Sequence, residues 1–83
     1  MIVKVRFFAS LREAVGLEQE SITLPAGATI QSLVQALAAK HPGLEAHLRA
    51  RGVRFAVNRC YALPDTGLKD GDEVAFVPPV GGG

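Results

Sequence analysis

The fold is decided by the stretch TIQSLVQALAAK, residues 29–40. Its apolar side chains recur three and four residues apart, at Ile30, Leu33, Val34, Leu37 and Ala38. That spacing places them along one stripe of an α-helix. Thr29 can cap the helix, and Pro42 disfavours helical geometry at His41, so we expect the helix to end by His41. An apolar stripe of this kind is typical of a helix that packs on a sheet.

Alternating side chains predict the strands of that sheet on both sides of the helix. The predicted strands are residues 2–8, 18–24, 53–57, 60–63 and 73–77. In the first strand, Val3, Val5 and Phe7 share one face and Lys4, Arg6 and Phe8 share the other. A later start of the second strand, only at residue 19 or 20, is the alternative. In the third and last strands, Ala56, Ala75 and Val77 are expected to point away from the helix.

Two shorter helices are expected around the main one. The pattern Ser10-Leu11-Arg12-Glu13 resembles a capping box and predicts a helix over residues 11–15, which Gly16 ends in a left-handed conformation. Leu44 and Leu48 can share one side of a second short helix within residues 43–51. Because only the main helix carries a large apolar stripe, we expect an α+β roll: a mixed sheet of about four to five strands covered on one face by that helix.

Composition excludes several functions. Nine basic and eight acidic residues give the 83-residue chain a nearly neutral charge balance, which favours neither nucleic acid nor a membrane surface as a partner.

The single cysteine, Cys60, excludes an internal disulfide, and we expect it to pack rather than react. His41 and His47 show no metal-ligand spacing, so both are predicted surface residues and no metal site is expected. Without an apolar targeting segment, a cytoplasmic location is expected.

The C-terminal residues form a tail that cannot pack. Pro78 and Pro79 should stiffen its base, and Gly81, Gly82 and Gly83 follow Val80. We therefore divide the chain into a domain of residues 1–80 and a flexible tail of residues 81–83. Glycines make the tail thin enough for a narrow channel, and its terminal carboxylate, with a reference pKa of about 3.5, is ionised at neutral pH. The alternative interpretation is an incidental frayed end.

Three further motifs decide between these interpretations. VRFFASLRE (residues 5–13), AVN (56–58) and LKDGDEVAFVPPV (68–80), joined to the final Gly82-Gly83, resemble the small subunit of molybdopterin synthase over essentially the whole chain. The resemblance implies a ubiquitin-like β-grasp fold. One departure is Gly81, where members of that family often carry another small or polar residue. Sulfur carriers for thiamine thiazole synthesis also end in Gly-Gly and are the second resemblance, although they usually lack the two prolines.

The resemblance implies a role as a sulfur carrier without catalytic residues of its own. An adenylating enzyme would use ATP and Mg²⁺ to convert the Gly83 carboxylate to an acyl-adenylate, and a sulfur donor would then leave a thiocarboxylate. The large subunit, with which such carriers form a heterotetramer, would direct the sulfur onto cyclic pyranopterin monophosphate. General acids and bases are expected on that subunit, and this chain is expected to bind no cofactor itself.

The resemblance also implies docking through the open sheet face, at Phe8, Tyr61 and Val77, with Pro78 and Pro79 at the base of the tail. Two other functions remain open at this stage. One is a ubiquitin-like modifier whose Gly83 is joined to lysines of target proteins. The other is a plain interaction domain in which the tail has no role.

Overall fold

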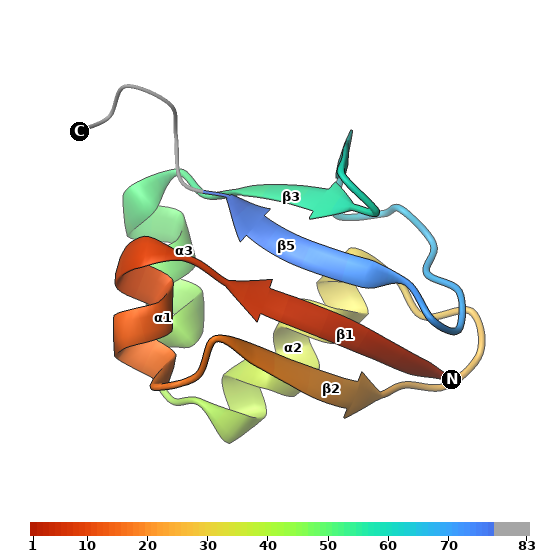
Figure 1. The fold of residues 1–83 in the computed structure, drawn as a ribbon, viewed down its shortest axis with the longest axis horizontal. Helices are drawn as coiled ribbons and strands as arrows, with labels where there is room; N and C mark the ends of the chain where they lie inside the picture. The colour runs from red at the N-terminus through yellow and green to blue at the C-terminus, as the bar shows by residue number, and fades with distance from the viewer. Residues whose placement is uncertain (78–83) are drawn as a thin grey trace.

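A computed structural model of the chain describes residues 1–77, with the side chains at positions 9, 10 and 49–51 excepted. Five strands and three helices follow one another along the chain (Figure 1). They are β1 Ile2–Phe7, α1 Ala9–Val15, β2 Gln19–Thr23, α2 Ile30–Lys40, α3 Leu44–Arg51, β3 Arg54–Val57, β4 Cys60–Ala62 and β5 Glu73–Val77. The predicted boundary between residues 1–80 and the tail of residues 81–83 lies outside the described residues.

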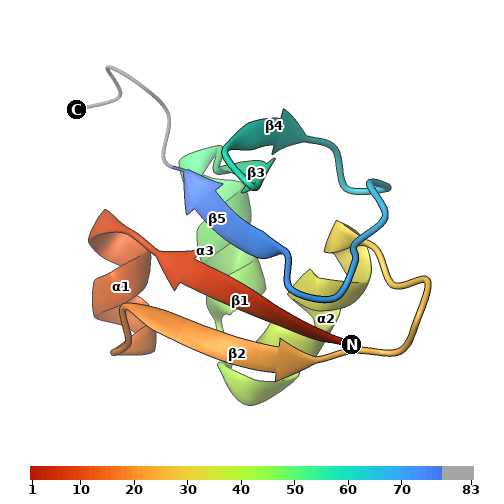
Figure 2. The ribbon, with the colours of Figure 1, turned by 45° about the vertical axis from the view of Figure 1, so that its right-hand side comes forward.

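The strands form one mixed sheet in the order β2-β1-β5-β3-β4. β1 and β5 are parallel neighbours at its centre, and the other neighbouring pairs are antiparallel. Figure 2 shows that the helices lie on one side of this sheet. The α+β arrangement predicted from the alternating strands is therefore confirmed.

The core lies between the sheet and the helices. Most side chains with at most 2% exposure come from β1 and β5 on the sheet side and from α2 on the other: Val3, Val5, Phe7, Val74, Phe76, Ile30, Leu33 and Leu37. Leu11 of α1 and Leu44 and Leu48 of α3 are buried in the same cluster. The expectation that one helix covers the sheet was therefore incomplete, since three helices contribute buried side chains.

The helix boundaries test the capping predictions. Thr29 does cap α2, because its hydroxyl accepts from the Ser32 N–H at 3.3 Å while the Thr29 N–H donates to the Ser32 hydroxyl. Ser10 as the cap of α1 was wrong, since that helix begins at Ala9. The N–H groups of Leu11 and Arg12 close its first turn on the Phe8 carbonyl, so the cap is Phe8, without a side-chain hydrogen bond.

Gly16 ends α1 as predicted. Its φ of 83° is left-handed, and its N–H donates to the Arg12 carbonyl at 2.8 Å. β3 and β4 are each one residue shorter than predicted. Val53 donates its N–H to the Leu48 carbonyl of α3, and Leu63 donates its N–H to the Thr66 hydroxyl. These bonds keep both residues out of the ladder.

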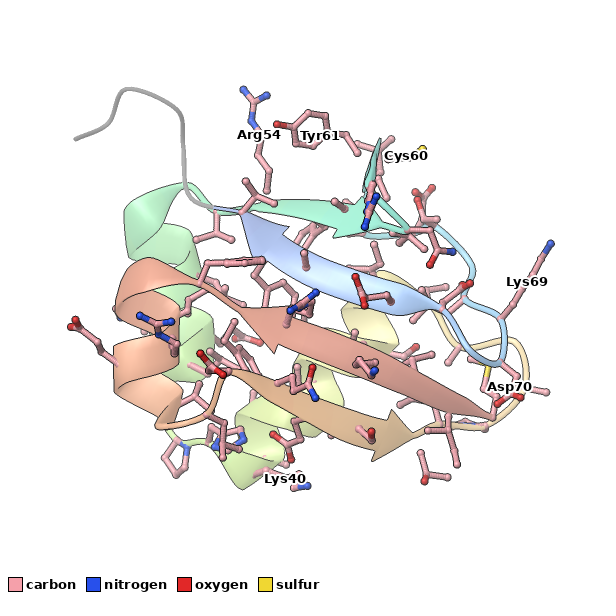
Figure 3. The ribbon with its side chains drawn as sticks, in the orientation of Figure 1. Lys40, Arg54, Cys60, Tyr61, Lys69 and Asp70 are labelled. Carbon is pink, nitrogen blue, oxygen red and sulfur yellow. The ribbon has the colours of Figure 1, made fainter. Side chains whose placement is uncertain are left out.

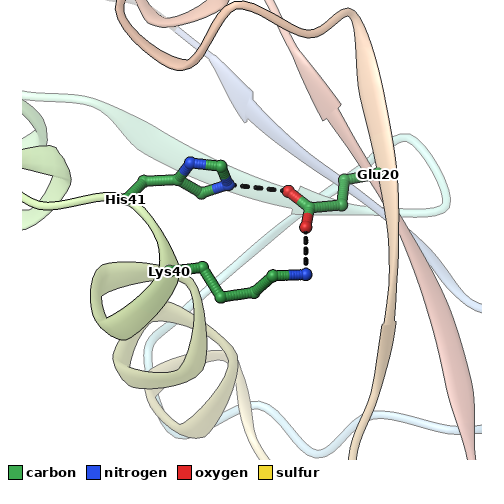
Figure 4. A network of polar contacts seen from close by, with 3 residues as sticks. All are labelled: Glu20, Lys40 and His41. Atoms are coloured by element: carbon green, nitrogen blue, oxygen red, sulfur yellow. Dashed lines mark hydrogen bonds and ion pairs between the residues drawn. The ribbon is translucent and has the colours of Figure 1, made fainter.

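Cys60 and His41 differ from their predictions. Cys60 opens the edge strand β4 and is exposed, so it does not pack in the core. His41 is not a free surface residue, because its side chain is only 21% exposed and its Nε2 lies 2.8 Å from the Glu20 carboxylate (Figure 4). Its ring also meets Phe7 edge to face, with centroids 6.4 Å apart. His41 thus helps to fasten the end of α2 to β2.

Lys40 reaches the same carboxylate (Figure 4). Burial raises the pKa of the Glu20 carboxyl, but the hydrogen bonds and positive charge of Lys40 and His41 outweigh burial and hold this pKa below its usual value. Glu20 is therefore held as a carboxylate between the sheet and the main helix.

Candidate functional site

The helices leave one face of the sheet open. The side chains of Lys4 and Arg6 point to this face from β1 and are exposed, as the alternation predicts. Arg6 lies 3.9 Å from the Glu73 carboxylate of the neighbouring β5, where both side chains are accessible to water. The region around β1 and β2 on this face is therefore polar.

Next to this polar region, the open face carries an apolar hollow of about 560 Å³. Strand register explains it, since Ala56 of β3 stands opposite Ala75 of β5 on one side and Tyr61 of β4 on the other. The two alanines make a low floor at adjacent positions. Larger side chains surround that floor. The hollow is lined by Phe8, Ala56, Arg59, Tyr61, Ala75 and Val77, and we call these six residues the sheet-face hollow.

The sheet-face hollow is rimmed by exposed aromatic rings. Phe8 is 44% exposed and Tyr61 is 66% exposed, and the two rings border one apolar hollow, the kind of contiguous surface that marks an interaction site. The Arg54 guanidinium lies 5.9 Å from the centre of the Tyr61 ring, and Figure 3 shows the two side chains together beyond the sheet. Exposed aromatic rings beside an apolar hollow are common anchors of protein interfaces.

The structure brings three of the predicted docking residues together. Phe8, Tyr61 and Val77 lie on three different strands or strand ends, and all three line the sheet-face hollow. Their role in docking stays a prediction. The other predicted site residues lie outside the described residues: Pro78, Pro79, Gly81, Gly82 and Gly83.

Ala56, Ala75 and Arg59 belong to the hollow but were not singled out from the sequence. The alternation did place both alanines outward, and their small size was the signal available. Arg59 gave no such signal, because its direction depends on the turn that it occupies. That turn joins β3 to β4 through two residues, Asn58 with φ 49° and Arg59 with φ 73°.

Hydrogen bonds hold this turn against β5. The Asn58 side chain accepts from the Glu73 N–H at 3.0 Å and donates to the Asp72 carboxylate at 2.9 Å. The Asn58 N–H donates to the Glu73 carbonyl at 2.8 Å. The turn, and with it one wall of the hollow, is therefore fixed to the strand that leads into the tail.

The open face carries few ionisable side chains. Its charged groups are cations and one exposed ion pair, and within residues 1–77 no three His, Cys, Asp or Glu side chains are placed to hold a metal ion. Among the same residues, no helix has the length and hydropathy needed to cross a membrane.

The sequence matches a known family and several known proteins over nearly the whole chain. Residues 5–83 match the ThiS family. The chain is 39% identical to the molybdopterin synthase sulfur carrier subunit of Chlamydomonas reinhardtii, with 100% of both chains covered. It is 40% identical to the Mycobacterium tuberculosis protein of the same name, over 98% of this chain and 96% of the relative. It is also 36% identical to small archaeal modifier protein 3 of Haloferax volcanii, with 100% of both chains covered.

Solved structures confirm the fold that the motifs implied. The crystal structure of SAMP1 from Haloferax volcanii superposes with a TM-score of 0.88 at 27% identity, and 100% of both chains is covered. A chain in the complex of subunits 1 and 2 of the molybdopterin-converting factor from Helicobacter pylori has a TM-score of 0.68 at 32% identity, again over 100% of both chains. The roll of mixed strands is thus a β-grasp fold, and the chain belongs to the ThiS family of ubiquitin-like sulfur carriers.

Proposed function

We propose that this protein is the sulfur-carrier subunit of a molybdopterin synthase. The observation that carries the proposal is the placement of the sheet-face hollow, which includes Val77 at the end of β5. Gly83 is only six positions after Val77 in the sequence. A partner that fills the hollow therefore holds the body of the protein next to the base of its tail.

The reacting group is the Gly83 carboxylate. An adenylating enzyme binds ATP with Mg²⁺, and a carboxylate oxygen of Gly83 attacks the α-phosphate while pyrophosphate leaves. The terminal sulfur of a persulfide donor then attacks the carbonyl carbon of the acyl-adenylate and AMP leaves. A thiol next attacks the donor-side sulfur of the acyl disulfide, which forms a new disulfide and releases the Gly83 thiocarboxylate. This chain supplies only the carboxylate, and the groups that bind ATP belong to the activating enzyme.

The length and composition of the tail suit entry into a partner. Six extended residues after Val77 span at most about 22 Å, at roughly 3.3–3.6 Å each. Pro78 and Pro79 restrict the first part of that span, which lowers the entropy lost when the tail enters a partner. Gly81 and Gly82 have no side chains, so a narrow channel can admit the backbone up to Gly83.

The sulfur acceptor in this proposal is cyclic pyranopterin monophosphate, bound by a large subunit. The Helicobacter pylori neighbour is a complex of subunits 1 and 2 of a molybdopterin-converting factor, which supports a partner of this kind. The catalytic acids and bases are then those of the large subunit. The carrier delivers sulfur, is released as a carboxylate and can be activated again.

A second candidate function is protein modification. It is favoured by the 36% identity to a small archaeal modifier protein and by the close superposition on SAMP1. Activation at Gly83 is common to both functions, and so is docking through the sheet-face hollow. They differ in product, because a modifier ends in isopeptide bonds to lysines and a carrier ends as a free thiocarboxylate. Supply of sulfur for thiamine thiazole is a third outcome, distinguished by its acceptor.

The test is intact-mass analysis of the protein after reaction with its own activating enzyme, ATP and a sulfur donor. We expect an oxygen-to-sulfur exchange at Gly83, followed by dithiolene formation when the large subunit and cyclic pyranopterin monophosphate are added. A variant with one phenylalanine appended after Gly83, and one lacking Gly82 and Gly83, should both fold normally and carry no sulfur. Sulfur delivery by the capped variant would contradict the proposal.

A further inference from the structure

Arg59 occupies a backbone conformation that is usually taken by glycine. It is the second residue of the two-residue turn between β3 and β4, with φ 73°. Such turns favour glycine at this position, because a Cβ atom is crowded where φ is positive. Asn58, the first turn residue, is a type that tolerates positive φ, whereas an arginine does so at a cost in free energy. Costs of this kind in folded proteins are often found at functional sites.

The side chain of Arg59 does not offset that cost within the described part of the chain. Among residues 1–77 it has no hydrogen bond or ion pair, whereas Arg6 faces Glu73 and Arg54 lies over Tyr61. Arg59 instead lines the sheet-face hollow. It is the only charged residue among the six that form this hollow, and its guanidinium has five donors beside an apolar floor.

The geometry points to Arg59 as a specificity-determining contact for the adenylating enzyme, which we infer presents a carboxylate beside the apolar group that enters the hollow. This inference rests on the proposed function and names the chemistry of that partner's docking surface. The hollow offers a positive group and no carboxylate, so an acidic partner surface is complementary to it. A phosphate-rich ligand fits poorly, because it needs several donors together and would lie on the alanine floor.

The position of Arg59 in the turn allows a substitution that removes its charge without destabilising the turn. Arg59→Gly removes the guanidinium and places at φ 73° the residue that tolerates this conformation best. We therefore expect Arg59→Gly to be as stable as the wild-type protein or more stable. A role limited to the turn would leave activation unchanged in this variant.

The experiment is steady-state adenylation of the full-length carrier by its own activating enzyme, followed as ATP–pyrophosphate exchange. We expect Arg59→Gly to raise the KM for the carrier roughly five-fold or more and to leave kcat unchanged, since the tail and Gly83 are intact. Arg59→Lys should recover part of the loss. Added salt should raise the wild-type KM more than that of Arg59→Gly, because salt screens the charge pair.

Lys69→Gln is the matched control for Arg59→Gln, because each removes one positive charge. Lys69 lies in the loop before β5, at the opposite end of that strand from Val77, and its side chain points away from the sheet (Figure 3). Equal KM values for Arg59→Gln and Lys69→Gln would overturn the inference, as would a lower KM for Arg59→Gly, which would indicate that Arg59 held the protein's own tail. If the wild-type carrier is not adenylated at all, the proposed function fails instead.

Discussion

The two faces of the sheet are made by the same strands, yet one is buried under the helices and the other is open. Phe7 and Phe76 face the helices and are at most 2% exposed. Their neighbours in the chain, Phe8 and Val77, face the other way and line the sheet-face hollow. A change of one position along a strand therefore exchanges a core residue for a residue of the candidate docking site.

The helix-facing side chains therefore serve stability, and those on the open face are available for recognition of a partner. Burial of the helix-facing side chains gives the favourable transfer of apolar surface from water that holds a small domain together. Exposed aromatic rings on the other face give no such gain in the free protein and are stabilised only when a partner covers them. Substitutions on the two faces should thus have opposite signatures, and four of them test this from the largest effect to the smallest.

Phe76→Ala should have the largest effect, and it should be on stability. The centroid of the Phe76 ring lies 6.1 Å from that of the Phe7 ring and 5.6 Å from that of the Phe55 ring, and Phe76 is fully buried. Removal of a buried phenylalanine ring costs about 3–5 kcal/mol, a large part of the 5–15 kcal/mol typical of a domain. Urea unfolding measures the loss, and Val77→Ala on the opposite face should cost much less. Similar losses for the two variants would remove the distinction between the faces.

Tyr61→Ala should show the reverse: a large loss of partner affinity and little change in stability. Since its ring is 66% exposed, we expect the free energy of unfolding to change by no more than about 0.5 kcal/mol. Loss of an aromatic anchor in an interface typically costs 2 kcal/mol or more, so affinity for the activating enzyme should fall roughly thirty-fold. Paired measurements of urea unfolding and of binding by calorimetry test this, and a variant that unfolds easily but binds normally would contradict it.

The distinction between the two faces could largely be predicted from the sequence. Alternation along a strand has a period of two, so Val74 and Phe76 could be assigned inward, and Ala75 and Val77 outward, without knowledge of the partner strands. The main helix was equally clear, because Thr29 and Pro42 mark its ends by local chemistry. These features depend on neighbouring residues alone.

Features that depend on distant residues could not be predicted in this way. His41 was taken for a surface residue because its partner, Glu20, is 21 positions away on another element. Arg59 was overlooked because the hollow that it lines arises only when β3, β4 and β5 are in register. The cap of α1 was misplaced for a local reason instead, since the helix begins at Ala9 and its first turn closes on the Phe8 carbonyl.

Glu20 tests how far the helix-covered side depends on polar contacts. Its pKa is lowered in the folded protein, so the unfolded chain binds more protons than the folded one around its ordinary value of 4.5. The contribution of Glu20 is thus complete above pH 4.5 and is lost as pH falls through the lowered value. Glu20→Gln should cost on the order of 1–2 kcal/mol at pH 7, as expected for hydrogen bonds to charged groups.

The measurement is urea unfolding of Glu20→Gln and wild type across acid pH. The difference between the two proteins should shrink as pH falls below 4.5, because the wild-type carboxylate is then protonated as well. Glu18→Gln is the matched control, since Glu18 lies nearby on the chain and its side chain is 81% exposed. A difference that is constant with pH would show that Glu20 acts by packing and not by charge.

Arg6→Gln should have the smallest effect, and this expectation follows from the open face itself. Arg6 and Glu73 are 3.9 Å apart with side chains 48% and 37% exposed, so water and salt screen their attraction. Exposed ion pairs of this kind contribute about 0–1 kcal/mol, and we expect a change in unfolding free energy below about 0.5 kcal/mol. A larger loss, abolished in high salt, would mean that charge on the open face stabilises the sheet as burial does on the other. A small one leaves this face free to change its residues to suit a partner while the core is preserved.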